Sequence, residues 1–473
     1  MDIAATIEAA RAAQASWGAQ TLKARLRVIA RFRHVFTLRM SDLQKIVEAA
    51  RPRPPGEALA SEILPVAETC AWLQNRAPKV LAPRGVGHGA GLVWRLISRV
   101  TVSREPHGVV LIIGPSNYPL GLAGVQALHA LTAGNAVIWK PGRGGEASAR
   151  AFCDITREAA LPPSLLCVLD ESADAAQAAI RAGVDKVVLT GSASTGSAVL
   201  EDLASRIVPA TMELSGCDAV FVLPGADLDL VVRALRFGMR FNDGATCIGP
   251  HRLFASSEIL TALEPRLTEA CREIGPCRVD PAVAARVRRL AQEAVEGGAR
   301  LLTGDLEDDA PYLPILLADA SPGMQLLKAD TFAPVLSIVS VQDEEDALEA
   351  ARVCPYALGA TVFGPARDAE AFAGRVPAGF VIVNDMIVPL GDPRVPFGGR
   401  GRSGFGVTRG AEGLLEMTRI RTVVASRGRS RPHLDAPPET SQAMLSAYMK
   451  ARHAFTLRER LAGWLGCLRV ILK

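Results

Sequence analysis

The sequence predicts an α/β protein built on parallel β-sheets, and three observations carry this prediction. Short apolar runs alternate with Ala-rich helical stretches from His107 onward. Within these runs the apolar residues are consecutive, as expected for strands that helices cover on both faces. The chain has 473 residues, which is too long for one hydrophobic core, so more than one domain is expected.

The expected strands fall into two groups along the chain. The first group comprises Val109–Ile113, Ala136–Trp139, Leu165–Leu169, Lys186–Leu189, Ala210–Glu213 and Ala219–Leu223. The second group lies within residues 226–395 and comprises Arg252–Ala255, Val335–Val341, Gly359–Phe363 and Gly379–Val383. Helical periodicity marks residues 4–50 and 57–76, with the Pro-rich segment 51–56 between them. A last helical stretch is expected over residues 440–472.

Composition and charge exclude several classes of protein. Apolar residues make up 49% and charged residues 22%, the balance of a globular protein rather than of a disordered chain. The net charge of +4 does not indicate a dedicated nucleic-acid binder. That charge is uneven, because residues 400–473 hold fourteen Lys or Arg against five Asp or Glu, which leaves −5 for the first 399 residues.

Targeting signals and cysteine usage favour a cytoplasmic protein. The longest apolar runs, such as Gly108–Gly114, fall far short of the roughly 20 residues that a membrane span needs. The N-terminus lacks the pattern of a signal peptide. The nine cysteines are scattered and join no cluster of histidines, so we expect a reducing compartment and no metal site.

Polar side chains follow the ends of several predicted strands. Asn117 and Lys140 come directly after two of them, and Glu213 ends another. Because carboxyl ends of parallel strands share one edge where ligands bind, these groups form a candidate site. The turn 190–196 includes Gly191, Ser192 and Gly196, and its helix start would offer N–H groups to a pyrophosphate. Taken singly, each feature is equally consistent with an ordinary turn or a helix cap.

Cys247 is the best candidate for a reactive thiol. It lies in the loop Phe241–Pro250, which is rich in Gly, Asn and Asp, whereas other cysteines lie within apolar runs. Reactive cysteines occupy polar, accessible surroundings, and buried structural cysteines are inert. An unreactive loop thiol is the alternative interpretation.

Together these segments resemble the NAD(P)-dependent aldehyde dehydrogenase superfamily over about residues 5–435, nearest to its class 3 and fatty aldehyde dehydrogenase branch. The matching segments, in chain order, are Glu105–Gly114, Asn117–Pro119, Gly134–Val137, Lys140-Pro141, Thr190–Ser192, Glu213-Leu214, Thr246-Cys247, Phe332 with Pro334-Val335, Asn384-Asp385, Pro396–Gly399 and Ser403-Gly404.

The resemblance implies an aldehyde dehydrogenase-like α/β fold. A Rossmann-type cofactor domain would comprise residues 1–81 and 105–218, and an α/β catalytic domain residues 219–407. A β oligomerisation arm would comprise residues 82–104 and 408–428, which leaves 429–473 as a basic helical C-terminal extension. A homodimer is expected from the nearest branch.

The resemblance also implies a chemical role for each candidate residue. Cys247 would attack the aldehyde as a thiolate and form a thiohemiacetal, with the Asn117 amide and the Cys247 N–H holding the oxyanion. Glu213 would activate the water that hydrolyses the resulting thioester. The cofactor, NAD or NADP, would contact the residues Lys140, Arg143, Gly191, Ser192, Gly196, Asp330 and Phe332.

Departures from the family pattern bear on the cofactor and on activity. Arg143 stands where the family usually has a Glu that accepts a hydrogen bond from the ribose 2′-hydroxyl. A guanidinium matches a phosphate instead, so Arg143 favours NADP, with a solvated Arg and NAD as the alternative. Asp330 is one methylene shorter than the usual Glu, and Ala245 and Ser116 replace a Gln and a Trp.

The C-terminal extension is predicted to be a basic amphipathic helix. Apolar side chains recur there at helical spacing, with Arg and Lys residues between them, over residues 440–473. Such a helix can lie on an anionic membrane, or it can pack on a subunit. Both possibilities stay open at this point.

The predicted function is therefore NAD(P)-dependent oxidation of an apolar, long-chain or aromatic aldehyde to its carboxylic acid. One alternative is a CoA-acylating enzyme, in which a thiol rather than water resolves the thioester, and Glu213 argues against it. The other alternative is a non-catalytic, membrane-associated homologue. We expect no nucleic-acid partner.

Overall fold

The computed structural model describes residues 2–87, 98–307, 310–427, 431, 434–435 and 438–472. The chain divides into two compact units. The first comprises residues 1–81 and 105–419, and the second residues 82–104 and 420–473. Each unit is described by itself.

The first unit contains a sheet formed by the first group of predicted strands, except that Ala219–Leu223 belongs to a second sheet. Its order is β17-β7-β6-β3-β4-β5, and only β17 is antiparallel to its neighbour. The strands are β3 (Val109–Ile113), β4 (Ala136–Lys140), β5 (Leu166–Val168), β6 (Lys186–Gly191), β7 (Ala210–Leu214) and β17 (Gly404–Phe405). Every residue of β3 is buried, which explains its consecutive apolar residues.

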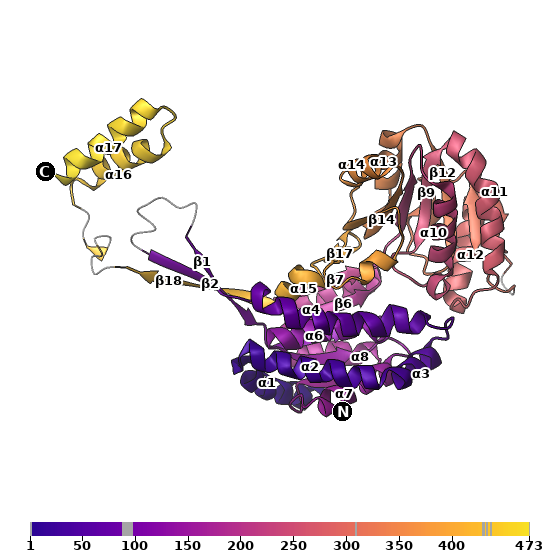
Figure 1. The fold of residues 1–473 in the computed structure, drawn as a ribbon, viewed down its shortest axis with the longest axis horizontal. Coiled ribbons are helices and arrows are strands. Elements are labelled where there is room, and N and C mark those ends of the chain that lie inside the picture. The colour runs from indigo at the N-terminus through magenta and orange to yellow at the C-terminus, as the bar shows by residue number, and fades with distance from the viewer. Residues whose placement is uncertain are drawn as a thin grey trace. The chain divides into compact units, whose positions relative to one another are not determined.

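Helices cover both faces of this sheet, as Figure 1 shows. The strands β4 and β5 are added on one side of β3, and β6 and β7 on the other side. The crossover helices of the two halves therefore lie on opposite faces of the sheet. Those helices are α6 (Gly121–Ala133), α7 (Glu146–Glu158), α8 (Ala173–Ala182) and α9 (Ala193–Ala204). Trp139 of β4 meets Phe152 of α7 with ring centroids 5.4 Å apart, and Phe152 meets Phe32 at 4.7 Å.

The N-terminal residues pack as helices against this core. The periodicity over residues 4–50 resolves into α1 (Ile3–Ala19), α2 (Leu22–Leu38) and α3 (Met40–Ala50). The predicted apolar face of α2 is confirmed, since Ile29, Phe32 and Phe36 are buried. The next stretch begins with a π-helical turn, η1 (Leu59–Ile63), which continues as α4 (Leu64–Val80).

A second sheet follows in the same unit, with the order β10-β11-β12-β9-β8-β14-β15. Its strands are β8 (Asp218–Val222), β9 (Pro250–Ser256), β10 (Arg300–Thr303), β11 (Ile315–Ala318), β12 (Val335–Val341), β14 (Gly359–Phe363) and β15 (Phe380–Val383). Its helices are α10 (Leu228–Arg240), α11 (Ser257–Ile274), α12 (Pro281–Glu296), α13 (Glu344–Arg352) and α14 (Ala366–Ala373). The short strands β10 and β11 were not predicted, because the apolar runs Leu301-Leu302 and Ile315–Ala318 are too short to distinguish a strand from a helix.

Further short elements of the first unit lie outside the two sheets. They are η2 (Phe241–Gly244), η3 (Gln325–Lys328), β13 (Tyr356–Ala357), η4 (Val388–Gly391), β16 (Arg400–Gly401) and α15 (Gly410–Glu416). Two of them, η2 and η4, contribute residues to the cavity described below.

The second unit contains a three-stranded sheet and two helices. The sheet has the order β1-β2-β18, with β1 (Arg84–Val86), β2 (Ser98–Pro106) and β18 (Thr418–Ser426). The prediction of one helical stretch over 440–472 was wrong in one respect, because α16 (Ser441–His453) and α17 (Leu457–Ile471) form a hairpin. Thr456 and Glu459 form a capping box that restarts the helix after the break. None of the described helices combines the length and the apolarity needed to cross a bilayer.

Candidate active site

Cys247 follows a strained turn that the sequence alone does not reveal. Asn242, Asp243 and Gly244 have φ values of 52°, 52° and 72°, so the backbone is left-handed three times in succession. Only glycine fits the third position, because a Cβ on Gly244 would lie 2.3 Å from the Pro334 nitrogen. Left-handed non-glycine residues cluster at functional sites, where surrounding contacts hold them in place.

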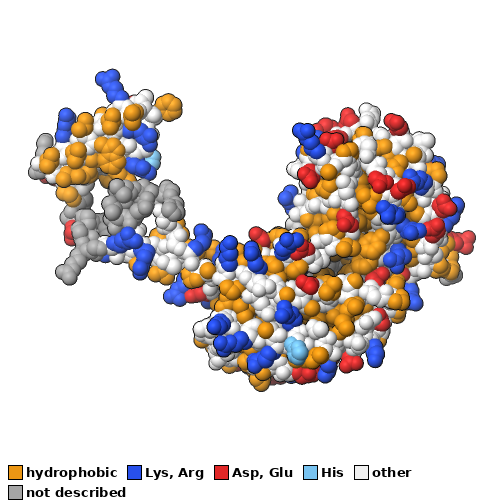
Figure 2. Space-filling view, in the orientation of Figure 1, with side chains coloured by type: hydrophobic (Ala, Val, Ile, Leu, Met, Phe, Trp, Pro, Cys, Tyr) orange, Lys and Arg blue, Asp and Glu red, His pale blue; other side chains and the backbone are white. Residues whose placement is uncertain are grey.

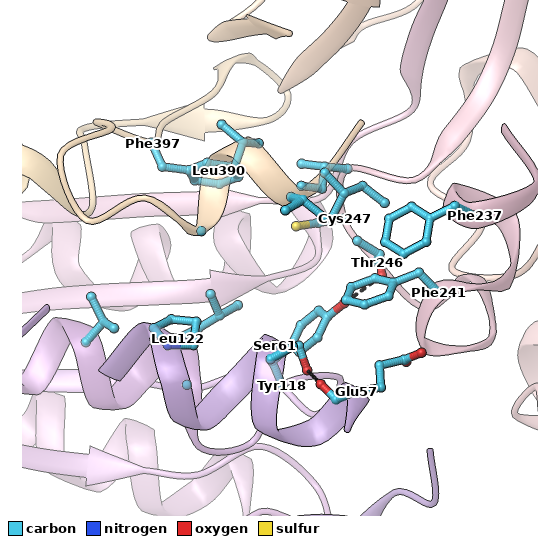
Figure 3. A pocket seen from close by; sticks show the side chains of 18 of the residues that line it. Glu57, Ser61, Tyr118, Leu122, Phe237, Phe241, Thr246, Cys247, Leu390 and Phe397 are labelled. Atoms are coloured by element: carbon cyan, nitrogen blue, oxygen red, sulfur yellow. Dashed lines mark hydrogen bonds between the residues drawn. The ribbon is translucent and has the colours of Figure 1, made fainter. Parts of the chain in front are cut away.

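Cys247 and Glu213 line one cavity of about 480 Å³. Most of the cavity wall is apolar, and it comprises side chains from α6, α10, η2 and η4. Figure 3 shows the Cys247 sulfur among Phe237, Phe241, Leu390 and Phe397. The structure thus brings together the predicted nucleophile and the predicted base, which lie 34 positions apart in the sequence.

Glu213 is buried and only half satisfied. Its Oε2 accepts a hydrogen bond from the Thr408 hydroxyl at 2.6 Å, whereas its Oε1 has no hydrogen-bond partner among the described residues. Burial raises the pKa of the Glu213 carboxyl, and the Arg409 cation and Thr408 oppose that rise. A carboxylate with a raised pKa and one free oxygen is suited to take a proton from a substrate or a water.

The thiol of Cys247 is held in its neutral form. Burial raises its pKa well above the usual range, the carboxylates of Glu213 and Asp218 raise it further, and Arg409 opposes them. Arg409 itself has a left-handed φ of 63° and stacks over the Phe397 ring at 4.7 Å. Thiolate formation at Cys247 therefore requires a nearby proton acceptor.

Asn117 reaches the same loop from the end of β3. Its Nδ2 donates to the Ala245 carbonyl at 3.0 Å, two residues before Cys247. One N–H of this amide is thereby used, which leaves the second for another acceptor. Tyr118, the next residue, shares a 2.7 Å hydrogen bond with the Thr246 hydroxyl and lines the cavity.

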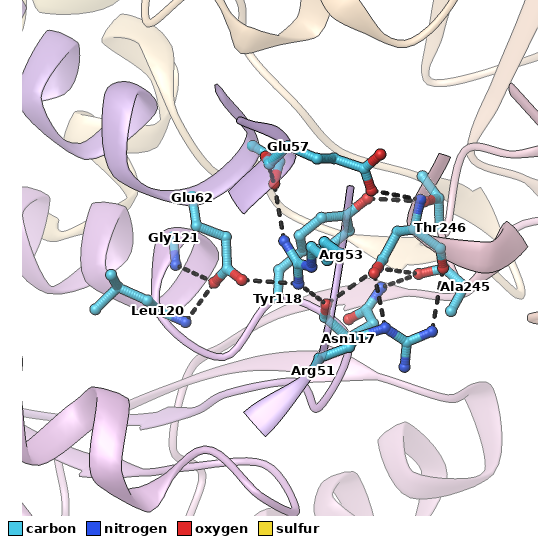
Figure 4. Close-up of polar contacts among 12 residues, drawn as sticks. Arg51, Arg53, Glu57, Glu62, Asn117, Tyr118, Leu120, Gly121, Ala245 and Thr246 are labelled. Atoms are coloured by element: carbon cyan, nitrogen blue, oxygen red, sulfur yellow. Dashed lines mark hydrogen bonds and ion pairs between the residues drawn. The ribbon is translucent and has the colours of Figure 1, made fainter. Parts of the chain in front are cut away.

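A buried ion pair behind the cavity holds Asn117 and Tyr118 in place (Figure 4). Arg53 and Glu62 approach to 2.8 Å, with side chains 1% and 0% exposed. Arg53 also donates to the Asn117 carbonyl at 2.8 Å, and its guanidinium lies 5.0 Å from the centre of the Tyr118 ring. Glu62 accepts from the backbone N–H groups of Leu120 and Gly121, which begin α6, at 2.7 and 3.0 Å.

Arg51 and Glu57 secure the strained turn in the same way. Arg51 donates from Nε to Asn242 Oδ1 at 2.7 Å, and Glu57 accepts from the Asn242 N–H at 2.8 Å. Asn242 in turn donates to the carbonyls of Asn117 and Ala245. Sequence reasoning missed these residues, because it treated the segment 51–56 as a break between helices. Glu62 within a helical stretch gave no signal that it would be fully buried.

The candidate cofactor residues lie outside the cavity wall, at the edge of the first sheet. Lys140 ends β4 half-buried, and its ammonium makes no hydrogen bond or ion pair with any described residue. Ser192 caps α9, as expected, by accepting from the Thr195 N–H at 3.1 Å. Gly191 ends β6, and a Cβ on Gly196 would meet the Leu214 side chain at 2.8 Å.

The other three candidate residues are committed to contacts or to a strained backbone. Arg143 pairs with Asp280 at 2.6 Å, and Asp330 pairs with Arg286 at 3.3 Å. Phe332 has a left-handed φ of 50°. Among the described residues, no group of three or more His, Cys, Asp or Glu side chains converges as a metal site would require.

Breaking the buried ion pair should destabilise the protein. Arg53→Met leaves Glu62 buried without its partner, and we expect a loss of about 3–5 kcal/mol in the free energy of unfolding. Denaturant unfolding of the first unit, monitored by intrinsic fluorescence, measures this loss. The matched control is Arg39→Met, since Arg39 and Glu158 form an exposed pair at 3.1 Å, for which about 0–1 kcal/mol is expected. Equal losses in the two variants would contradict the structural role of Arg53.

Comparisons with known proteins agree with the fold. The family model described as "Aldehyde dehydrogenase family" matches residues 1–423. The "4,4'-diapolycopene aldehyde oxidase" of Methylomonas sp is 32% identical over 384 residues, which cover 79% of this chain and 72% of that protein. The "Putative succinate-semialdehyde dehydrogenase [NADP(+)] 2" of Mycobacterium ulcerans is 29% identical over 94% of this chain and 88% of its own.

A solved structure shows the same fold. The crystal structure of Mycobacterium tuberculosis aldehyde dehydrogenase complexed with NAD+ superimposes with a TM-score of 0.82, at 26% identity and over 90% of each chain. The match of the family model to most of the chain, together with these relatives, shows that the protein belongs to the aldehyde dehydrogenase family.

Proposed function

We propose that this member of the aldehyde dehydrogenase family oxidises an apolar, long-chain or aromatic aldehyde to its carboxylic acid with NAD or NADP. The observation that carries the substrate class is the cavity wall around Cys247. Its large side chains include Leu122, Val125, Phe237, Phe241, Ile248, Val388, Leu390 and Phe397. Such a wall favours an apolar chain by about 25 cal/mol for each Å² that it removes from water.

The two cations of the cavity are already engaged, which argues against a second carboxylate on the substrate. Arg240 lies 3.9 Å from Glu57, and Arg409 stacks on Phe397 and donates to the Leu390 carbonyl. The diapolycopene aldehyde oxidase is named for an apolar aldehyde, and the succinate-semialdehyde dehydrogenase for a charged one. The cavity favours the first kind. It is equally in keeping with the class 3 and fatty aldehyde branch that the sequence motifs resemble.

The first half of the proposed reaction uses Cys247, Asn117 and Glu213. As the Cys247 thiol passes its proton to Glu213, its sulfur bonds to the carbonyl carbon and forms a thiohemiacetal. The free N–H of the Asn117 amide and the Cys247 N–H hold the developing oxyanion, each worth roughly 3–4 kcal/mol in such sites. Bound NAD(P) supplies the acceptor for the hydride that leaves the same carbon.

The second half releases the acid. Glu213 first releases the proton of the thiol to solvent. The thioester on Cys247 is then attacked by a water whose proton passes to the free Oε1 of Glu213, which later returns it to the sulfur. The bond from carbon to sulfur then breaks, the carboxylic acid leaves, and the thiol is restored. A carboxylate already placed for this step favours water over CoA as the group that resolves the thioester, so the CoA-acylating reaction is the weaker alternative.

The edge of the first sheet fits a dinucleotide. The half-buried Lys140 ammonium, which has no partner among the described residues, is available to a ribose hydroxyl. The start of α9 behind Gly191 and Ser192 offers backbone N–H groups to a pyrophosphate. Asp330 and Phe332 would contact the nicotinamide ribose, with Arg286 orienting Asp330. On these assignments, residues 1–81 and 105–218 form the cofactor domain and residues 219–407 the catalytic domain.

Replacing the proposed base should trap the acylated enzyme. Glu213→Gln should form the thioester slowly, because the Cys247 thiol must then lose its proton to solvent. Once formed, the thioester should persist, and steady-state turnover should fall by about 10²–10⁴, because no base activates the attacking water. Intact-protein mass spectrometry after mixing with decanal and NAD should then show one acyl group, which peptide mapping should place on Cys247. Glu68→Gln, an exposed carboxylate on α4, is the matched control and should turn over normally. No adduct in Glu213→Gln, or full activity in Cys247→Ala, would contradict the mechanism.

We further propose that the α16–α17 hairpin contacts an anionic membrane surface. Its two helices meet through small residues, since a Cβ on Gly463 would lie 2.2 Å from the Ala451 nitrogen. The large apolar side chains lie outside, and those more than half exposed include Leu445, Met449, Leu461, Leu465, Leu468 and Ile471. This is the reverse of an ordinary helical hairpin, which buries its large apolar residues.

Charge favours lipid over a second copy of the hairpin as the occupant of that face. Residues 438–472 hold five Lys or Arg against two Glu. Figure 2 shows blue side chains beside the orange surface of the hairpin. Anionic lipid headgroups attract such residues, while their aliphatic stems lie along the apolar boundary. Peripheral contact of this kind suits an enzyme whose apolar substrate partitions into the bilayer.

The three-stranded sheet of the second unit is the proposed dimer contact. Its edge strand β18 exposes Ile420, Val423 and Val424. An exposed apolar edge strand is a template for pairing with another strand. We propose a homodimer in the cytoplasm, peripheral to the membrane.

Vesicle binding tests the hairpin. Replacing Leu461, Leu465 and Leu468 with Ser should weaken binding of the full chain to phosphatidylglycerol vesicles by at least about ten-fold. Co-sedimentation measures this, with phosphatidylcholine vesicles as the charge control. The matched variant Leu38→Ser alters an exposed leucine of α2 and should bind normally. Unchanged vesicle binding, with an altered sedimentation coefficient in the absence of lipid, would show instead that the hairpin docks on protein.

A further inference from the structure

A carboxylate of the chain itself fills the start of α7. Glu171 follows β5, and its Oε2 accepts from the Gly144 N–H at 2.8 Å while its Oε1 accepts from the Glu146 N–H at 2.9 Å. The first N–H groups of a helix favour an anion. Without Glu171, the N–H groups at the start of α7 would be available to a phosphate group of a ligand beside Lys140. The anion already present belongs to the protein.

Lys140 lies next to this carboxylate. The strands β4 and β5 are neighbours with Trp139 opposite Val168, so Lys140 and Glu171 follow the same edge of the sheet. Burial lowers the pKa of Lys140, and the charges of Glu171 and Asp170 act against that lowering. The ammonium thus already has two acidic neighbours.

Arg143 is occupied by a third carboxylate. It pairs with Asp280 at 2.6 Å, and Asp280 also caps α12 by accepting from the Ala282 N–H at 3.0 Å. The pair is exposed, so solvent screens it and little stability is lost when it breaks. Even if Arg143 turns away, Asp280 is held by its helix cap and remains at the same edge.

The charges at this edge of the sheet favour a neutral hydrogen-bond donor over an anion. Lys140, Arg143 and Arg150 face four carboxylates, those of Glu146, Asp170, Glu171 and Asp280. A phosphate monoester brings up to two more negative charges and no donor at neutral pH. A ribose 2′-hydroxyl brings a donor, and each carboxylate oxygen of Glu171 keeps a lone pair to accept it.

We propose that Glu171, supported by Asp280, makes this protein select NAD over NADP. Glu171 accepts the hydrogen bond of the adenosine 2′-hydroxyl and repels a 2′-phosphate, and Asp280 withholds Arg143 from that phosphate. The inference rests on the proposed role of Lys140 as a ligand of the adenosine ribose. Arg143 alone predicted a preference for NADP. That prediction is reversed because the fold brings Glu171 and Asp280 to the same edge of the sheet.

Dinucleotide binding without substrate tests the inference. We would titrate the full-length protein with NAD+ and with NADP+ by calorimetry, in the absence of aldehyde, at about 50 mM salt where charge effects are weakly screened. NAD+ should bind at least about ten-fold more tightly. Glu171→Gln should reduce this ratio about ten-fold, mainly through tighter NADP+ binding. Asp280→Asn should move the ratio in the same direction by freeing Arg143.

Controls separate this inference from the proposed reaction. Asp154→Asn removes a carboxylate that pairs with Arg157 on the same helix at 2.8 Å, and it should leave the ratio unchanged. Tighter binding of NADP+ to the unaltered protein, or an unchanged ratio in both Glu171→Gln and Asp280→Asn, would overturn the inference. If that happens while the acyl adduct on Cys247 still forms, the proposed reaction stands. If neither dinucleotide binds, both fall.

Discussion

The site depends on the buried ion pair of Arg53 and Glu62. A cavity wall made of apolar side chains cannot also supply hydrogen bonds to the polar groups that border it. Those groups are satisfied from behind instead, by one guanidinium that reaches Glu62, the Asn117 carbonyl and the Tyr118 ring. Glu62 extends the support to the start of α6, and it does so from a π-helical turn, a distortion common at functional sites. The cavity can be apolar because its polar support lies outside it.

The same burial sets the acid–base properties of the site. It raises the pKa of both Cys247 and Glu213, so the resting thiol is neutral and the carboxylate is a stronger base than usual. Arg409 and Thr408 limit the rise at Glu213, which keeps its base form accessible. Because the pKa of Glu213 is raised, its base form is lost sooner as the pH falls, and the chemistry proposed here belongs to neutral and alkaline solution. The apolar surroundings that favour an apolar substrate are therefore the same ones that raise the pKa of Cys247 and Glu213.

Much of the fold was predictable because its strands are buried on both faces. The runs at β3, β4 and β12 are apolar at nearly every position, and their alternation with helices indicated parallel sheets. Cys247, Glu213 and Asn117 were candidates because they follow strand ends or lie in a polar loop. The supporting residues were not predictable, since Arg51, Arg53 and Glu62 look like solvated charges, and their contacts with Asn242, Asn117 and Leu120 join residues 58 or more positions apart. Arg143 shows the same limit, because Asp280 lies 137 positions further on.

The central claim is that an apolar cavity selects an apolar aldehyde for Cys247. The most direct measurement compares kcat/KM for decanal with kcat/KM for succinate semialdehyde, with NAD in excess. Each buried methylene contributes about 0.8 kcal/mol, and a carboxylate in the apolar cavity would lose its hydration. The account predicts a preference for decanal of at least about 100-fold. Equal values, or a preference for succinate semialdehyde, would contradict it and would show that Arg240 or Arg409 binds a substrate carboxylate.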